Sequence, residues 1–466
     1  MPGRYAILTR DYQLRGWTDR PLTVVNAVLG HVRPLTRSMF YVLESCDGRT
    51  NFESLAFLPK HRAFLDEFIA DGVVEECCYG GDLDPAQRFR KAENPCLKGI
   101  DWCVTGRCNL RCRHCFMESP SGRYGQLPFD DMANLIDQFV AANVLQVAIT
   151  GGEPFIRRDL IDIFARLAEK SIGLSQVYTN GLLLTDAHLN AIQSLGLRPS
   201  FQISFDGVGS HDQMRGVDGV ERSTVTAIRR VEEAGFAVAV STCVDRLNVD
   251  RLEDTYELMQ QLRIASWRVS IPQKTGNWRD TKTAVTLDEM ANASMPLLDR
   301  WFRDGRPFIM QLGGFYNGVP VPMSPEEELR RQPGFTPDDF DCLACREQPN
   351  LLPDGTLLPC PGYVGSSMEE RMPNLLSEIT LSEAWHDSLL RSIANMKKRD
   401  LLERNPECTS CDLFRQCGIG CRSSALTETG DFMARDPVAC VLWKKGYRRR
   451  FHERRVALQC ELQKRF

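Results

Sequence analysis

Cysteines are the residues of this chain whose number and spacing point most directly to chemistry. There are 18 of them among 466 residues: one group lies at 96–115, a second lies at 342–440, and Cys243 stands alone between them. Within the first group, Cys108, Cys112 and Cys115 are spaced C-x3-C-x2-C in the stretch CVTGRCNLRCRHCFM. Disulfide bonding would not need such clustering, so we expect metal or redox chemistry.

Two kinds of metal centre suit three thiolates at this spacing. Zinc in a structural site normally takes a fourth protein ligand, which His114 could supply. A cubane iron–sulfur cluster held by three thiolates instead leaves one iron without a protein ligand, and a small molecule with an amine and a carboxylate can chelate that iron. Cys103 lies five residues before the first of the three within a predicted strand, where we expect a buried thiol.

The overall composition argues against several classes of protein. A formal net charge of -4 creates no global field that favours nucleic acid or membranes. The first residues, MPGRYAILTR, contain no apolar segment typical of a secretory signal, and no apolar run approaches the roughly 20 residues of a membrane span. We therefore expect a cytoplasmic protein that binds neither nucleic acid nor a membrane.

Strand-like and helix-like segments alternate from residue 99 to about 290, which predicts a parallel sheet with helices outside it. Six strand candidates suit a partial (β/α)6 barrel, so the expected fold class is α/β. Active sites of such barrels lie at the C-terminal ends of the strands, where the motifs described below fall. The strand candidates are 99–104, 144–150, 174–178, 201–205, 237–244 and 267–271.

The C-x3-C-x2-C motif followed by Phe116 resembles the signature of radical S-adenosylmethionine (SAM) enzymes. Further motifs support this resemblance, because ITGGEPF at 149–155 follows the second predicted strand, TNG at 179–181 the third and SFDG at 204–207 the fourth. The resemblance implies that Cys108, Cys112 and Cys115 hold a [4Fe–4S] cluster whose open iron binds SAM. The SAM contacts that it implies are Phe116 at the adenine, Gly151, Gly152 and Glu153 at the methionine amino group, Asn180, and Ser204 with Arg215 at the methionine carboxylate and ribose.

The second cysteine group has a pattern of its own, in which Cys345, Gly355 and Cys360 precede a C-x2-C-x5-C-x3-C run. This resembles the seven-cysteine SPASM domain, which extends radical SAM enzymes that modify peptides and proteins. The resemblance implies two auxiliary [4Fe–4S] clusters, and therefore three clusters in the chain. Their implied ligands are Cys345, Cys360 and Cys421 with Cys342 as the fourth, and Cys408, Cys411, Cys417 and Cys440. Two zinc sites are the alternative that CxxC pairs alone would allow.

Residues 1–80 predict a small winged-helix domain, and its CDG at 46–48 and DGVVE at 71–75 resemble PqqD-like domains. Such domains capture leader peptides of ribosomally synthesised, modified peptides (RiPPs) as an added strand. DNA binding is the alternative, although few basic residues cluster here. The remaining chain divides into a polar linker at 81–98, the barrel at 99–290, a bridging region at 291–340 and the SPASM domain with a basic C-terminal tail at 341–466.

The resemblance implies a radical SAM oxidoreductase that modifies a precursor peptide. Reductive cleavage of SAM yields a 5′-deoxyadenosyl radical, which abstracts a hydrogen atom from the substrate. The expected product is a side-chain crosslink through a carbon–sulfur, carbon–carbon or carbon–oxygen bond, with the auxiliary clusters taking the electron back. Flavodoxin or ferredoxin is the expected electron donor.

Three alternatives stay open at the level of sequence. Epimerisation needs a hydrogen donor, for which Cys243 is a candidate if it faces inward, although a buried core thiol is the simpler interpretation. Sulfatase maturases share the barrel and the SPASM pattern, but they lack a leader-binding domain and carry an aspartate where this chain has Pro361. A non-enzymatic electron carrier would need neither the GGEP motif nor Ser204 and Arg215. The sequence does not identify the peptide, the modified residues, the bond or the oligomeric state.

Overall fold

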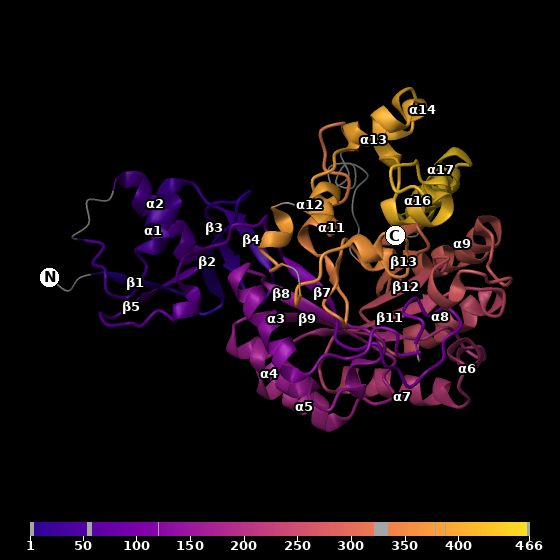
Figure 1. Cartoon of the computed structure of the whole chain (residues 1–466), viewed down its shortest axis with the longest axis horizontal. Coiled ribbons are helices and arrows are strands. Elements are labelled where there is room, and N and C mark those ends of the chain that lie inside the picture. The colour runs from indigo at the N-terminus through magenta and orange to yellow at the C-terminus, as the bar shows by residue number, and fades with distance from the viewer. Residues whose placement is uncertain are drawn as a thin grey trace.

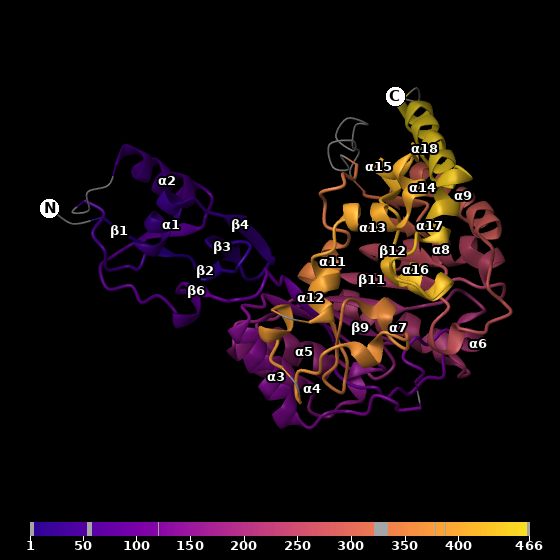
Figure 2. The same ribbon diagram turned by 45° about the horizontal axis from the view of Figure 1, so that its top comes forward.

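The computed structural model describes residues 4–53, 58–119, 121–320, 334–377, 379–386 and 388–463. A curved sheet with helices on its outer face occupies the centre, and an N-terminal domain projects from one side of it (Figure 1). Figure 2 shows the C-terminal subdomain, in orange to yellow, lying across the top of the barrel. No helix among the described residues is both long enough and apolar enough to cross a lipid bilayer.

Six parallel strands form the barrel in chain order, which confirms the predicted fold class. They are β7 (Gly99–Cys103), β8 (Gln146–Thr150), β9 (Gly173–Thr179), β10 (Ser200–Ser204), β11 (Val238–Cys243) and β12 (Ser266–Ser270). The helices of this region are α3 (Phe129–Ala141), α4 (Leu160–Glu169), α5 (Asp186–Ser194), α6 (His211–Arg215), α7 (Val220–Glu233), α8 (Leu252–Gln261) and α9 (Leu287–Arg303). Each strand therefore sends its C-terminal end to the same rim.

The pleat of the strands separates a helix-facing side from an interior side. In β11, Val238, Val240 and Thr242 are buried, whereas the alternate residues Ser241 and Cys243 are only partly buried. Helices such as α7 cover the buried side with an apolar stripe at helical spacing. The alternate residues consequently face the interior of the barrel, which is more polar than its wall.

Both edges of the barrel sheet are extended by strands from the C-terminal part of the chain. β13 (Ile309–Leu312) pairs parallel to β12, and β14 (Tyr316–Gly318) pairs antiparallel to β13. At the other edge, β15 (Asn350–Leu351) pairs parallel to β7, and β16 (Leu357–Leu358) pairs with β15. The predicted bridging region and SPASM region thus both supply strands, which cover backbone groups that an open edge would expose.

The C-terminal subdomain is built mainly from short helices around loops. They are α11 (Leu343–Glu347), α12 (Leu389–Ala394), α13 (Lys398–Arg404), α14 (Pro406–Thr409), α15 (Phe414–Cys417), α16 (Arg422–Thr429), α17 (Pro437–Lys444) and α18 (Tyr447–Gln463). The basic tail forms α18 and packs against α9, because Tyr447, Phe451 and Leu458 are buried and Arg454 pairs with Asp299 at 2.6 Å.

The N-terminal domain combines two small sheets with two described helices. β1 (Tyr5–Leu8) pairs with β5 (Val74–Cys77), and a second sheet has the order β4 (His31–Pro34), β3 (Thr23–Asn26), β2 (Tyr12–Gly16), β6 (Arg90–Lys91). Beside them lie α1 (Arg37–Glu44), which is capped by the side chain of Thr36, and α2 (Pro59–Ala70). β6 belongs to the stretch predicted as a linker, so part of that stretch completes the N-terminal sheet. A two-residue strand in a polar sequence carries too little pattern to be predicted.

Hydrogen bonds dock the N-terminal domain onto the turn between α3 and β8. The buried side chain of Asn143 donates to the carbonyls of Gly16, at 3.2 Å, and Arg90, at 3.0 Å. The carbonyl of Ala142 accepts from the Trp17 indole at 3.3 Å. Because these buried polar groups are partnered across the boundary, the domain is held against the barrel rather than only tethered to it.

Candidate active site

The loop that follows β7 brings Cys108, Cys112 and Cys115 into one packed cluster of side chains. Burial raises the pKa of Cys108 to about 12, and the Glu153 carboxyl and the two other thiols act in the same direction. Three thiolates this close repel one another unless a cation lies among them, so the donor set fits a metal centre. The ring of His114 instead places Nε2 3.5 Å from an Asp206 carboxylate oxygen.

A loop after β12 holds the cysteine loop from one side. The amide of Asn277 donates to the Cys115 carbonyl at 3.0 Å, and its side chain donates to the Cys112 carbonyl at 3.2 Å. Gly276 has φ +51°, and a Cβ there would lie 2.3 Å from the Cys115 oxygen and 2.7 Å from that of Phe116. Phe116 itself is partly buried against the barrel core. Gly276 and Asn277 belong to no motif, so the sequence did not predict their contact with the cysteine loop.

The GGE turn after β8 holds the cysteine loop from the other side. Gly152 donates its amide to the Thr105 carbonyl at 2.7 Å, and Glu153 donates its amide to that of Arg107 at 2.9 Å. A Cβ on Gly151 would lie 2.5 Å from the Thr105 oxygen, and one on Gly152 would lie 2.1 Å from the Arg107 oxygen. The turn therefore needs glycine because two backbones touch.

The carboxylate of Glu153 is fully buried and bonded within the protein. It accepts hydrogen bonds from the Thr179 hydroxyl and the Asn180 amide, both at 2.8 Å. The side chain of Asn180 in turn donates to Asn109 of the cysteine loop at 2.8 Å. These bonds hold the ends of β8 and β9 against the cysteine loop, so both side chains position it.

Ser204 and Arg215 differ in how far they are engaged. Arg215 is buried, its Nε lies 2.8 Å from the Asp206 carboxylate, and its Nη1 donates to the Cys112 sulfur at 3.5 Å. Asp206 raises the pKa of Arg215 against the opposing effect of burial. The hydroxyl of Ser204, at the end of β10, has no hydrogen-bond partner among the described residues. Ser204 is thus open to a ligand, while Arg215 is already paired.

Cys243 faces the interior of the barrel and joins a group that the sequence did not reveal. Its sulfur, a ring nitrogen of His114 and a carboxylate oxygen of Asp206 lie within 4.8 Å of one another. Burial lowers the pKa of His114 to about 4 despite the neighbouring carboxylate, so the imidazole is neutral at pH 7. Only the SFDG motif, which contains Asp206, could have signalled this group.

The structure also brings Cys342, Cys345, Cys360 and Cys421 together. Burial raises the pKa of Cys345, with Cys342 and Cys360 as neighbouring thiols, and Cys360 in turn has Cys421 and Cys342 nearby. Tyr363 packs beside Cys360, Cys345 and Cys421, and its buried hydroxyl has no partner in the described part of the chain. The unpaired Tyr363 hydroxyl beside these thiols fits a metal centre that supplies hydrogen-bond acceptors, such as the sulfur atoms of a cluster.

A separate cavity is lined by Cys408, Cys411, Cys417 and Cys440. The four cysteines come from α14, α15, α17 and the loop between α14 and α15. Burial raises the pKa of Cys417 to about 11, with Cys440 and Cys408 acting in the same direction. Trp443, Lys444 and Arg435 are among the other residues that line it. The eight C-terminal cysteines thus lie in two groups of four, and their role as cluster ligands stays a prediction.

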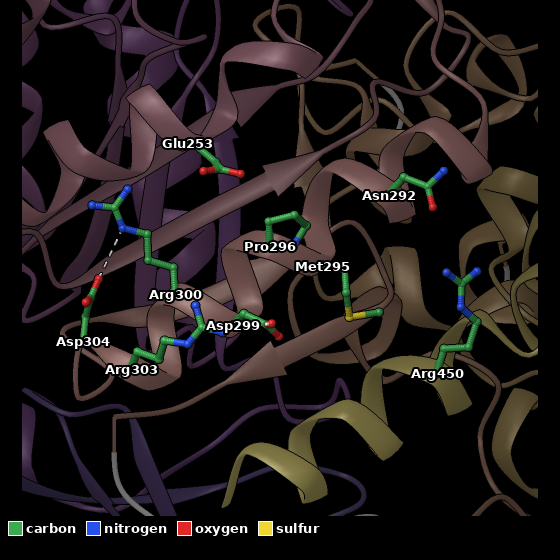
Figure 3. Close-up of a pocket in the computed structure, with 9 residues that line it drawn as sticks. All are labelled: Glu253, Asn292, Met295, Pro296, Asp299, Arg300, Arg303, Asp304 and Arg450. Atoms are coloured by element: carbon green, nitrogen blue, oxygen red, sulfur yellow. Dashed lines mark ion pairs between the residues drawn. The ribbon is translucent and has the colours of Figure 1, made fainter. Parts of the chain in front are cut away.

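Two larger hollows differ in their relation to these centres. One, of about 690 Å³, lies between the ends of β12 and β13 and the helices α16 and α17, and it includes Arg268 and Gln311 in its lining. The other, of about 620 Å³, lies outside the barrel between α8, α9 and α18 (Figure 3). Its Arg300 pairs with Asp304 at 3.6 Å (Figure 3). The first hollow opens from the strand ends where chemistry is expected.

Comparison with known proteins agrees with this geometry. Residues 102–259, from the end of β7 through α8, match the Radical SAM superfamily. Over this range the chain is similar to radical SAM enzymes. Enzymes of this superfamily use SAM and a [4Fe–4S] cluster, and the C-x3-C-x2-C loop lies inside the matched range.

Curated relatives of this chain have different activities. It is 28% identical over 362 residues to an AdoMet-dependent heme synthase of Nitratidesulfovibrio vulgaris, covering 74% of this chain and 92% of the relative. It is 27% identical over 342 residues to a PqqA peptide cyclase of Ruegeria pomeroyi, covering 72% of this chain and 85% of the relative.

Solved structures resemble this chain in fold. Streptococcus suis SuiB bound to its precursor peptide SuiA matches 93% of this chain and 99% of SuiB, with a TM-score of 0.65 and 14% identity. The enzyme anSMEcpe with bound AdoMet matches 76% of this chain and 94% of its own, with a TM-score of 0.55 and 16% identity.

Replacing Glu153 with glutamine should change how stability depends on pH. Burial raises the pKa of this carboxyl to about 7 in the folded chain, whereas in an unfolded chain it is about 4.3. Between about pH 4.3 and about pH 7 the folded state therefore binds one more proton than the unfolded state does. The contribution of Glu153 to the free energy of unfolding is complete below this range and is lost as the pH rises through about 7. Relative to Glu153→Gln, the wild type should lose on the order of 3 kcal/mol between pH 4 and pH 8.

Urea unfolding at several pH values measures this difference. Glu169→Gln is the matched control, because Glu169 is an exposed acid at the end of α4 that pairs with Arg166 on the surface. If the free energies of unfolding of the wild type and Glu153→Gln changed with pH in the same way, the raised pKa of Glu153 would be contradicted.

Replacing Gly276 with alanine should displace the cysteine loop, because the new Cβ would meet the Cys115 carbonyl at 2.3 Å. We expect a tenfold or greater loss of 5′-deoxyadenosine formation and a drop in bound iron. Gly219→Ala is the control, since Gly219 also has a positive φ, of +78°, but an added Cβ meets nothing within 4 Å. Equal iron content and SAM cleavage in the two variants would show that the contact is unimportant.

Proposed function

We propose that this chain is a radical SAM enzyme that modifies a ribosomally synthesised precursor peptide and that its usual product is a side-chain crosslink. The observation that carries the proposal is the likeness to SuiB with its precursor peptide over 93% of this chain. The part of the chain that this likeness leaves uncovered is shorter than the N-terminal domain. The likeness therefore includes much of that domain. The heme synthase and peptide cyclase relatives align over 72–74% of the chain at 26–29% identity, too distant to assign a substrate.

The N-terminal domain offers an open sheet edge to the leader of that peptide. β4 is an edge strand of its sheet, and His31 and Pro34 at its two ends are exposed. An extended peptide can add to such an edge through backbone hydrogen bonds. A PqqD-like role of residues 1–80, with a flavodoxin or ferredoxin as electron donor, completes the proposal.

The residues that would hold SAM and its cluster surround the cysteine loop. Cys108, Cys112 and Cys115 would ligate three irons, and the hydroxyl of Ser204, which has no partner among the described residues, would bind on the methionine carboxylate and ribose side. When bound, the cluster and SAM supply a 5′-deoxyadenosyl radical that removes a hydrogen atom from the substrate. Arg215 keeps a cation beside Cys112, and the GGE turn holds the loop rigid against β8.

A crosslink removes two hydrogens from the peptide. One leaves as a hydrogen atom to the radical, and the other leaves as a proton and an electron when the new bond forms. The eight C-terminal cysteines would hold two auxiliary [4Fe–4S] clusters, which can accept that electron. The positions of Cys345 and Cys360, on either side of the β15–β16 pair attached to β7, favour a site near the barrel.

Epimerisation is the second candidate, and the orientation of Cys243 favours it. A thiol facing the interior at the end of β11 can donate a hydrogen atom to a substrate radical. The donation leaves a sulfur radical, which one electron and one proton from the reducing system must restore. The peptide mass then stays unchanged, because the hydrogen removed is replaced by another.

Co-expression with a short open reading frame beside the gene tests the proposal. We expect the peptide to lose two hydrogens by mass spectrometry, and Cys112→Ala, which removes a cluster ligand, to leave it unmodified. Unchanged mass with deuterium uptake from solvent, abolished by Cys243→Ala, would identify an epimerase instead. An unmodified peptide in the wild type, when SAM cleavage is active, would refute a peptide substrate.

Tyr363→Phe tests the proposed first auxiliary cluster. The buried hydroxyl beside Cys345, Cys360 and Cys421 should donate to a cluster sulfur, and its removal should lower the reduction potential of that cluster. Electron paramagnetic resonance during a redox titration measures the shift, with iron content as the control for loss of the cluster. An unchanged potential would place the hydroxyl away from the cluster.

A further inference from the structure

One arginine faces the interior of the barrel from the middle of a strand. In β12 the neighbours Trp267 and Val269 are buried toward the helices, while Arg268 between them is exposed to the interior. The strand register places Arg268 opposite Ser241 of β11 on one side and Gln311 of β13 on the other. These paired residues share one side of the sheet, so they form a polar row across the barrel wall.

The guanidinium of Arg268 forms neither an ion pair nor a hydrogen bond among the described residues. It lines the hollow of about 690 Å³, together with the amides of Gln311 and Asn317. The two other charged residues of that lining, Lys274 and Glu428, pair with each other at 3.2 Å. The described lining of this cavity therefore has a surplus of one positive charge and further hydrogen-bond donors.

Arg268 lies close to the residues expected to meet the substrate. Burial raises the pKa of Cys243 to about 12, and the Arg268 cation opposes that effect, which requires the two side chains to be near each other. In the register, Ser241 also pairs with Ser204, so Arg268 lies two strands from the proposed SAM contact. Two strand spacings are about 10 Å, a distance that a substrate side chain can span.

We propose that Arg268 binds a carboxylate of the substrate peptide, from an aspartate or glutamate side chain next to the residue that reacts. A guanidinium presents paired donors that match a carboxylate, and a partly enclosed cavity strengthens the interaction relative to water. The amides of Gln311 and Asn317 can complete the recognition. This assignment rests on the proposed function, because it specifies the class of peptide that the cavity accepts.

Kinetics with the precursor peptide encoded beside the gene test the assignment. Arg268→Gln should lower kcat/KM for the peptide at least about tenfold, mainly through KM, and Arg268→Lys should recover part of the loss. Changing one acidic residue of the peptide to its amide should cause a similar loss in the wild type and little further loss in Arg268→Gln. Arg263→Gln is the matched control, since Arg263 is an exposed arginine whose guanidinium lies 3.8 Å from surface Glu232; it should leave the kinetics unchanged.

Three outcomes would overturn the assignment. The first is an Arg268→Gln enzyme with unaltered peptide kinetics, and the second is a wild type insensitive to every acid-to-amide change in the peptide. The third is a loss of SAM affinity in Arg268→Gln that accounts for the whole defect, which would assign Arg268 to the carboxylate of SAM itself.

A wild type that modifies no peptide would refute the proposed function, and the carboxylate site can then be tested separately. Phenylglyoxal modification of Arg268, followed by mass spectrometry, should be slowed by N-acetylglutamate α-amide, which keeps only the side-chain carboxylate, but not by N-acetylglutamine α-amide, which has none. Equal rates with both compounds would refute the carboxylate site.

Discussion

Backbone-to-backbone contact around the cysteine loop is the constraint on which the rest of the structure depends. The loop touches the turn after β8 through Gly151 and Gly152, and it touches the loop after β12 through Gly276. At each contact a Cβ would approach a carbonyl oxygen to between 2.1 and 2.5 Å, so any larger residue would move the three thiols relative to the strand ends. A centre that needs three ligands in a fixed arrangement is best held in this way, since backbone atoms have no rotamers.

The sheet carries this constraint to the second cysteine group. β15 adds to β7, so the chain segment between Cys345 and Cys360 is hydrogen-bonded to the strand that leads into the first group. Cys103, at the end of β7, is buried as its sequence predicts, and its sulfur lies 3.7 Å from the Asn350 side chain. One continuous sheet thus sets the position of Cys345 and Cys360 relative to the barrel centre, whereas Cys408, Cys411, Cys417 and Cys440 lie on short helices and the loop between two of them.

The polar groups that bear on the proposed sites are of two kinds. Glu153 and Arg215 are buried with partners, and they hold strand ends and the cysteine loop in place. The hydroxyls of Ser204 and Tyr363 and the guanidinium of Arg268 lack hydrogen-bond partners among the described residues and face a proposed ligand or substrate. Because an unpaired polar group costs stability unless a ligand satisfies it, the second kind marks where binding is expected.

The sequence alone determined the six barrel strands, because alternating apolar segments and their spacing encode a parallel sheet locally. It also determined the cysteine sets and the GGE, TNG and SFDG motifs, since each is a short pattern of residue types. Only the tertiary structure decided the pairing of β6, β13 and β15, the role of Gly276 and Asn277, the partners of Glu153 and Arg215, and the inward direction of Cys243 and Arg268. Those features depend on contacts between segments far apart in the chain, and a two-residue strand or a lone arginine has no periodic pattern of its own from which such contacts can be inferred.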